Sequence, residues 1–147
     1  MNISQYDQDF YAWSQEQADL LRARRFRDLD LDHLIEELES MGARERRELT
    51  NRLKVLLAQL LKWRHQPHLQ SRSWAATIKE QRLSIQDLLE DNPSLERILD
   101  QQTTKAYRLA RLLAVRETNL EETTFPETCP FSREEIRDED FYPGSVG

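Results

Sequence analysis

Glycine is almost absent from this sequence, and this scarcity constrains the fold more than any other feature does. The 147 residues contain 3 glycines, and two of them, Gly144 and Gly147, lie at the very end of the chain. Sandwiches and barrels need Gly-rich turns at short intervals, so the sequence excludes an all-β fold. The length is sufficient for one domain of ordinary size with its own core.

Proline residues divide the chain into pieces of helical length, and apolar residues within these pieces recur every three to four positions. The start of the last piece is marked by Asn92 as an N-cap and by Pro93 at the first helical position. The spacing predicts four helices, over residues 5–25, 31–65, 73–91 and 93–119. Because the connections are short, we expect an all-α fold in which about four long helices form an antiparallel bundle. Gly42 either interrupts the second helix or is tolerated within it.

The apolar periodicity stops after Asn119. We therefore divide the single domain into a helical bundle of residues 1–119 and an acidic, Pro-containing tail of residues 120–147. The tail is expected to be mostly irregular, with one short helix that begins at the capping box of Ser132. Its aromatic side chains should dock it on the bundle; they are Phe125, Phe131, Phe141 and Tyr142.

Charge is distributed unevenly along the chain. The net charge is -6, yet residues 41–86 carry ten basic and three acidic side chains and form a basic hairpin between acidic segments. In the interpretation that we prefer, the acidic segments lie along this hairpin and neutralise it. The alternative is an anionic partner such as a nucleic acid, although the sequence pI of about 5.2 opposes long-range attraction.

The corner of the basic hairpin, residues 62–74, is the densest candidate site. It combines hydroxyls, basic side chains and the start of a helix, which together suit a phosphate or a carboxylate. The candidate anion-binding residues are Arg64, His65, His68, Ser71, Arg72 and Ser73. Trp63 and Trp74 could stack on a base, but aromatic residues at helical spacing more often fill a core, and we expect both to be largely buried.

The sequence contains no pattern that is typical of a catalytic or metal site. His33 with Glu36 and Glu37 has helical spacing, but a metal site in a bundle needs a second such set. No nucleophile motif, Gly-rich phosphate loop or paired C-x-x-C is present, and Cys129 is the single cysteine. We therefore expect no metal, no cofactor and no catalytic residues. An enzyme whose site has no recognisable motif stays a third alternative.

Several segments, taken in order, resemble the bacterial domain of unknown function 29 family. They include Tyr6-Asp7-Gln8-Asp9-Phe10-Tyr11-Ala12-Trp13, Glu36-Glu37-Leu38-Glu39-Ser40-Met41-Gly42, Arg72-Ser73-Trp74, Asn92-Pro93-Ser94-Leu95 and Phe125-Pro126-Glu127-Thr128-Cys129-Pro130. The resemblance covers nearly the whole chain. It implies an all-helical, intracellular bacterial protein, and it implies no activity, substrate or site residue.

The long amphipathic helices and the lack of catalytic motifs favour a protein that acts by binding. We expect a small cytoplasmic helical-bundle protein that binds a protein partner or associates with itself. An anion or nucleic-acid binder that uses residues 62–74 is the alternative. No apolar run approaches the length of a membrane span, and no apolar segment follows Met1, so we expect no membrane association.

Overall fold

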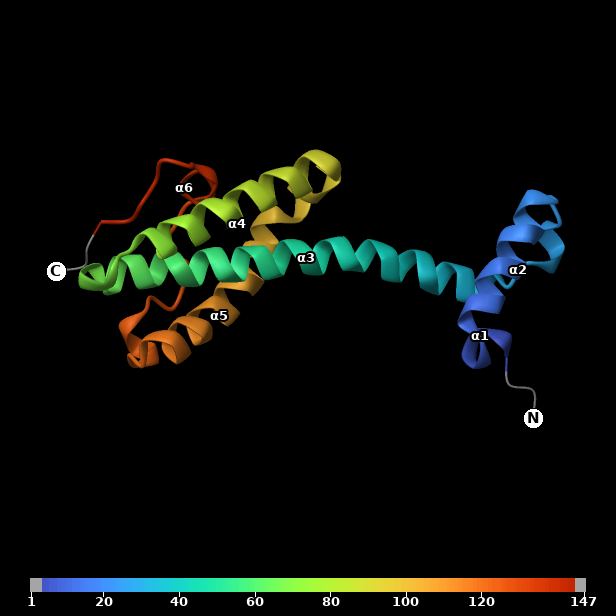
Figure 1. Cartoon of the computed structure of the whole chain (residues 1–147), viewed down its shortest axis with the longest axis horizontal. Helices are drawn as coiled ribbons and strands as arrows, with labels where there is room; N and C mark the ends of the chain where they lie inside the picture. Colours follow the sequence, from blue (N-terminus) through green and yellow to red (C-terminus); the bar gives the residue numbers. More distant parts are fainter. Residues whose placement is uncertain (1–3, 145–147) are drawn as a thin grey trace. The chain divides into compact units, whose positions relative to one another are not determined.

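The chain is all-helical, as predicted. The computed structural model describes residues 4–144, and no strand occurs within that range. The α-helices within it are α1 (Gln5–Gln8), α2 (Phe10–Arg22), α3 (Leu31–His65), α4 (Arg72–Asp91), α5 (Leu99–Thr118) and α6 (Arg133–Arg137) (Figure 1). None of these helices has the length and the apolarity that a bilayer-spanning segment needs.

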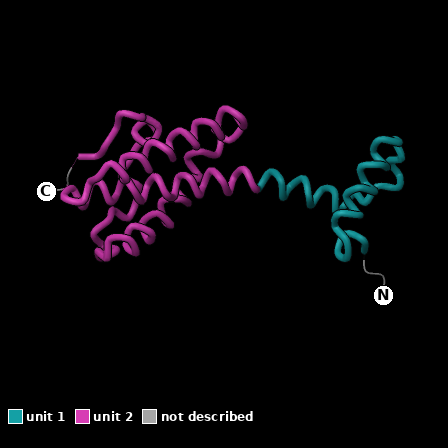
Figure 2. The backbone as a smooth tube through the Cα atoms, in the orientation of Figure 1, with its two compact units in different colours: residues 1–43 teal, residues 44–147 magenta. Residues whose placement is uncertain are grey.

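The chain forms two compact units, residues 1–43 and residues 44–147 (Figure 2). The boundary lies just after Gly42, inside α3, which is helical throughout. The predicted division between the bundle and its docked tail, after residue 119, lies within the second unit.

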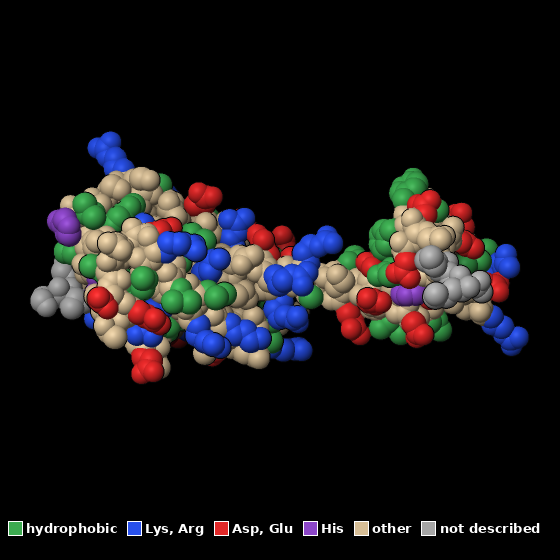
Figure 3. All heavy atoms as spheres, turned by 90° about the horizontal axis from the view of Figure 1, so that it is seen from below, with side chains coloured by type: hydrophobic (Ala, Val, Ile, Leu, Met, Phe, Trp, Pro, Cys, Tyr) green, Lys and Arg blue, Asp and Glu red, His purple; other side chains and the backbone are tan. Residues whose placement is uncertain are grey.

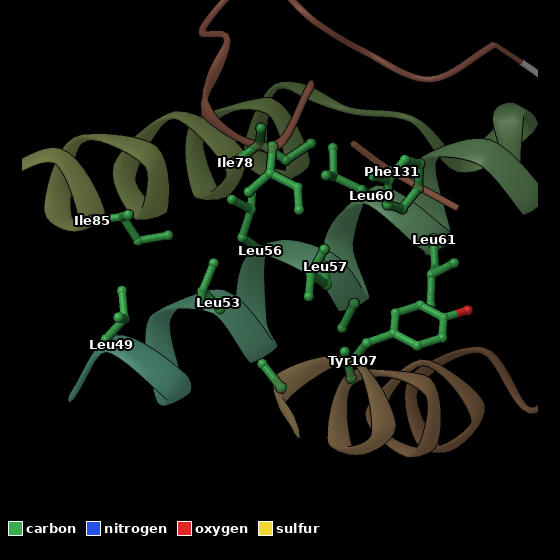
Figure 4. Close-up of a cluster of buried hydrophobic side chains, with 14 of the residues drawn as sticks. Leu49, Leu53, Leu56, Leu57, Leu60, Leu61, Ile78, Ile85, Tyr107 and Phe131 are labelled. Atoms are coloured by element: carbon green, nitrogen blue, oxygen red, sulfur yellow. The ribbon is translucent and has the colours of Figure 1, made fainter. Parts of the chain in front are cut away.

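The second unit is a bundle built on the leucine-rich part of α3. Leu49, Leu53, Leu56 and Leu60 recur at helical spacing and are fully buried. Helix α4 returns antiparallel to α3 after the short 3-10 turn Pro67–Leu69, and α5 lies on the other side of α3 (Figures 1 and 4). The buried leucines therefore face helices on two sides.

The tail completes this core, as predicted. Phe125, Phe131 and Ile136 are 1%, 6% and 4% exposed, and Phe141 packs against the same cluster. The predicted capping box is present, with the Ser132 hydroxyl accepting from the backbone N–H of Glu135. Tyr142 is 37% exposed.

Two predicted helices differ from those observed. Residues 5–25 do not form one helix, because the chain breaks at Asp9, whose side chain accepts a hydrogen bond from Ala12 N at 3.1 Å and caps α2. Asn92 does not cap α5. Its amide donates to Leu88 O at 3.1 Å and so closes the end of α4, and a 3-10 helix, Pro93–Ile98, precedes α5.

The first unit consists of α1, α2, the 3-10 turn Phe26–Asp28 and the beginning of α3. Among its described residues, 4–43, only Trp13 and Gln17 are buried. A unit of this size with so small a core is not expected to be stable by packing alone. Its polar contacts and its exposed surface therefore require an explanation.

Candidate protein-binding surface

A cluster of aromatic and polar side chains holds the first unit together. The Trp13 indole N–H donates to Oδ2 of Asp30 at 2.9 Å, and Nδ1 of His33 lies 2.7 Å from the same oxygen. The Tyr6 ring stacks on the His33 imidazole with the ring centroids 4.0 Å apart. One carboxylate thus links α2 to the start of α3, and Tyr6 extends the link to α1.

Two further hydrogen bonds secure this arrangement. The Tyr6 hydroxyl donates to Glu37, one helical turn beyond His33. The side-chain oxygen of Gln17 accepts from the backbone N–H of Asp30 at 2.8 Å, which explains why this glutamine is buried. Helices α1 and α2 therefore cover the face of α3 that carries His33 and Glu37.

These contacts shift the ionisation of three groups. The hydrogen bond with His33 lowers the pKa of Asp30, and the same bond raises the pKa of His33. The hydrogen bond to Glu37 raises the pKa of Tyr6 to about 12. The cluster therefore favours the ionised form of Asp30 and the protonated form of His33, and at neutral pH Tyr6 stays a hydrogen-bond donor.

A neighbouring face of α3 carries an exposed apolar stripe. Its members follow one another by three or four residues, and each is more than half exposed: Leu31 57%, Ile35 52%, Leu38 65% and Met41 57%. This spacing places them along one side of the helix. We call these four residues the α3 stripe.

The α3 stripe lies in a strongly acidic segment. Residues 28–43 contain six acidic side chains and neither lysine nor arginine. Asp32 and Glu39 lie three and four residues from Ile35, so they border the stripe on one side, and both are exposed. A surface that covers this stripe would therefore meet apolar side chains beside negative charge.

The outer face of α5 in the second unit carries more basic than acidic side chains. Leu109 and Leu112 are 48% and 52% exposed and line a hollow of about 660 Å³. The hollow is also lined by Lys105, Arg108, Arg111, Glu122 and Glu127, and we call it the α5 groove. Figure 3 shows hydrophobic and basic side chains next to each other on the α5 side of the second unit.

Residues 5–142 of the chain match the family described as Domain of unknown function DUF29. The chain belongs to this family. Neither a curated protein nor a solved structure was found to match it. The DUF29 match confirms the predicted resemblance and includes both the α3 stripe and the α5 groove.

The predicted anion-binding residues of this DUF29 chain divide between two environments. Arg64 lines a small hollow with the tail residues Phe131 and Phe141, and the His65 ring lies edge-on to Phe125 at 5.0 Å. His68, Ser71, Arg72 and Ser73 are exposed around the turn into α4.

Two observations argue against an anion at this corner. The Ser71 hydroxyl accepts from Trp74 N at 3.2 Å and caps α4, and burial lowers the pKa of His65 and favours its neutral form. The anion site stays a prediction.

The two tryptophans at this corner are half-buried, contrary to the expectation that they would be largely buried. Trp63 packs on the core and against Tyr142, with the ring centroids 4.8 Å apart. The Lys62 ammonium lies 4.7 Å from the centroid of the Trp74 ring, so that face of the indole is occupied by a cation. Trp74 therefore has no vacant face on this side for a base to stack on.

Arg82 is the residue whose role the sequence analysis missed. We counted it among the charges of the basic hairpin, yet it is only 4% exposed. Its guanidinium donates to three tail carbonyls, those of Ile136 at 2.9 Å, Phe141 at 2.8 Å and Glu135 at 3.0 Å. The sequence spacing could have indicated this burial, because Arg82 lies between Ile78 and Ile85 on the apolar side of α4.

The expected neutralisation of the basic hairpin by tail carboxylates does not occur through ion pairs. Within residues 4–144, no carboxylate of the tail forms an ion pair with a basic side chain of residues 41–86. The tail instead supplies the cations: Arg133 and Arg137 pair with Glu96, at 3.5 and 3.0 Å. Lys62 pairs with Glu117 of α5 at 2.9 Å.

Proposed function

We propose that this DUF29 chain is a protein-binding module and that its first unit is the part that binds. One observation carries the proposal. Of the thirteen large hydrophobic side chains that are exposed among residues 4–144, eight lie in the first unit, which buries only Trp13 and Gln17. They are Phe10, Tyr11, Leu21, Phe26 and the four members of the α3 stripe.

A surface of this kind is costly in water. Each large apolar side chain that becomes buried contributes roughly 1.5–3 kcal/mol relative to the exposed state. The polar cluster around Asp30 occupies the neighbouring face of α3 and leaves the α3 stripe uncovered. We infer that a protein surface covers the α3 stripe during function.

We place the protein in the cytoplasm as part of the same proposal. Cys129, the single cysteine, is half-buried, and burial raises the pKa of its thiol. This environment favours an unreactive thiol over one that forms a disulfide with another chain, in keeping with a reducing compartment.

Site-specific photo-crosslinking tests the binding role. A benzoylphenylalanine at position 38 should form covalent adducts with protein in the cells that make the chain, because Leu38 is the most exposed member of the stripe. The matched control places the same group at Lys79, an exposed residue of α4. Adducts at position 38 that are absent at position 79 support the proposal, and equal labelling at the two positions contradicts it.

A further inference from the structure

We propose that the partner is a second copy of this chain, and that the α3 stripe of one copy docks into the α5 groove of the other. This inference rests on the proposed function and names the partner. It follows from the chemistry of the two surfaces.

The charges of the two surfaces are complementary. The α3 stripe is bordered by Asp32 and Glu39 in a segment without lysine or arginine. In the α5 groove, Arg111 is already engaged by Glu122 and by the carbonyl of Phe125. Within residues 4–144, neither Lys105 nor Arg108 forms an ion pair. Among the described residues, the groove therefore presents two unpaired cations, beside the single unpaired carboxylate of Glu127, to a segment that contains neither lysine nor arginine.

The apolar part of the groove matches one step of the α3 stripe. Leu109 and Leu112 are three residues apart, and so are Leu38 and Met41, which spans about 5 Å along each helix. The hollow of about 660 Å³ beside Leu109 and Leu112 offers a concave site for apolar side chains of a facing helix. Pairing two α3 stripes with each other would instead bring acidic segments together.

The mass of the full chain in solution tests this inference. Light scattering over a concentration series should show the average mass rising above 17.5 kDa, and the rise should weaken as salt is added. A chain that stays monomeric at every concentration overturns the inference. In that case the crosslinks at position 38 still test the proposed function separately, because they would join the chain to a protein other than a second copy of itself.

Charge reversal tests the two surfaces separately. The double substitution Asp32→Lys with Glu39→Lys, and separately Lys105→Glu with Arg108→Glu, should each weaken association at least tenfold. Combining all four substitutions should restore it, because the attraction is recovered with its sign exchanged. The control Lys79→Glu, on the outside of α4, should leave the association constant unchanged.

Circular dichroism and the urea midpoint of each variant show whether it is folded. If the folded fourfold variant fails to regain association, the pairing of these two surfaces is wrong. The same holds if either folded double variant associates as strongly as the wild type.

Discussion

Arg82 and Phe141 are joined by a hydrogen bond of 2.8 Å, from Nη1 to the backbone carbonyl, across 59 residues of sequence. Ile136 and Glu135 accept from the other guanidinium nitrogens. A buried guanidinium is tolerated when it forms hydrogen bonds, and here each of its three nitrogens donates to a backbone oxygen and none pairs with a carboxylate. The tail is therefore fixed by directional contacts as well as by its aromatic side chains.

Replacing Arg82 should strongly destabilise the second unit. Arg82→Gln removes the charge and most of the donors, and it leaves buried carbonyls without partners, so we expect the free energy of unfolding to fall by about 3 kcal/mol. Urea denaturation measures this change. Arg72→Gln, at an exposed position of the same helix, should change it by less than about 0.5 kcal/mol. A loss from Arg82→Gln as small as that of the control would show that the hydrogen bonds of Arg82 to the tail do not stabilise the unit.

His33 and His65 should show different pKa values in a pH titration followed by NMR. The bond to Asp30 raises the pKa of His33 above 6.5, and burial lowers the pKa of His65 below 6.5. Asp30→Asn should lower the pKa of His33 and leave that of His65 in place. His33→Gln and His65→Gln assign the resonances. The reverse order of the two pKa values would contradict the contacts seen in the first unit.

The Asp30–His33 pair gives the stability of the first unit a pH optimum. Because the pKa of His33 is raised on folding, its contribution to stability is complete below pH 6.5 and is lost as the pH rises through the folded value. Because the pKa of Asp30 is lowered, its contribution is present above pH 3.8 and is lost as the pH falls through the folded value. Trp13 fluorescence should therefore show its native signal most fully between these limits. In Asp30→Asn the dependence should flatten.

A buried and a half-buried aromatic side chain should contribute differently to the free energy of unfolding. Phe125 is 1% exposed, so Phe125→Ala should lower the free energy of unfolding by about 3–5 kcal/mol. Trp63 is half-buried, and Trp63→Ala should cost about 2 kcal/mol, less than its burial in the predicted core would have implied. Urea denaturation of both variants measures the difference. Equal losses would mean that Trp63 is more enclosed than the structure shows.

Gly42→Ala should stabilise α3. The position is helical, and an added Cβ would meet no atom within 4 Å. Alanine is favoured over glycine inside a helix by about 1 kcal/mol, so amide hydrogen exchange around this position should slow about fivefold. Exchange in α4 serves as the internal control. Faster exchange near position 42 would show that the glycine is required for a non-helical conformation.

The bundle could be predicted from the sequence because its helices bury regular apolar stripes. The spacing of Leu49, Leu53, Leu56 and Leu60 indicated both the helix and its buried side. The capping box at Ser132 and the apolar tail residues indicated where the tail would dock. In each case a local pattern and the final packing agree.

The rest depended on partners that are distant in sequence. Arg82 looks like a surface charge until carbonyls more than fifty residues away are known to accept from it. The α3 stripe matches the buried leucines of α3 in spacing, so its exposure could not be read from periodicity. Trp74 was expected inside, whereas Lys62 covers one face of its ring.

The position of the three acceptors of Arg82 has a consequence for synthesis on the ribosome. They lie 53 to 59 residues after Arg82. While the tail is still in the exit tunnel, α3, α4 and α5 can associate, but the guanidinium must stay hydrated, and burying it early would be unfavourable. The second unit can therefore reach its final state only after the tail has left the tunnel, which leaves the nascent bundle open to chaperones until that moment.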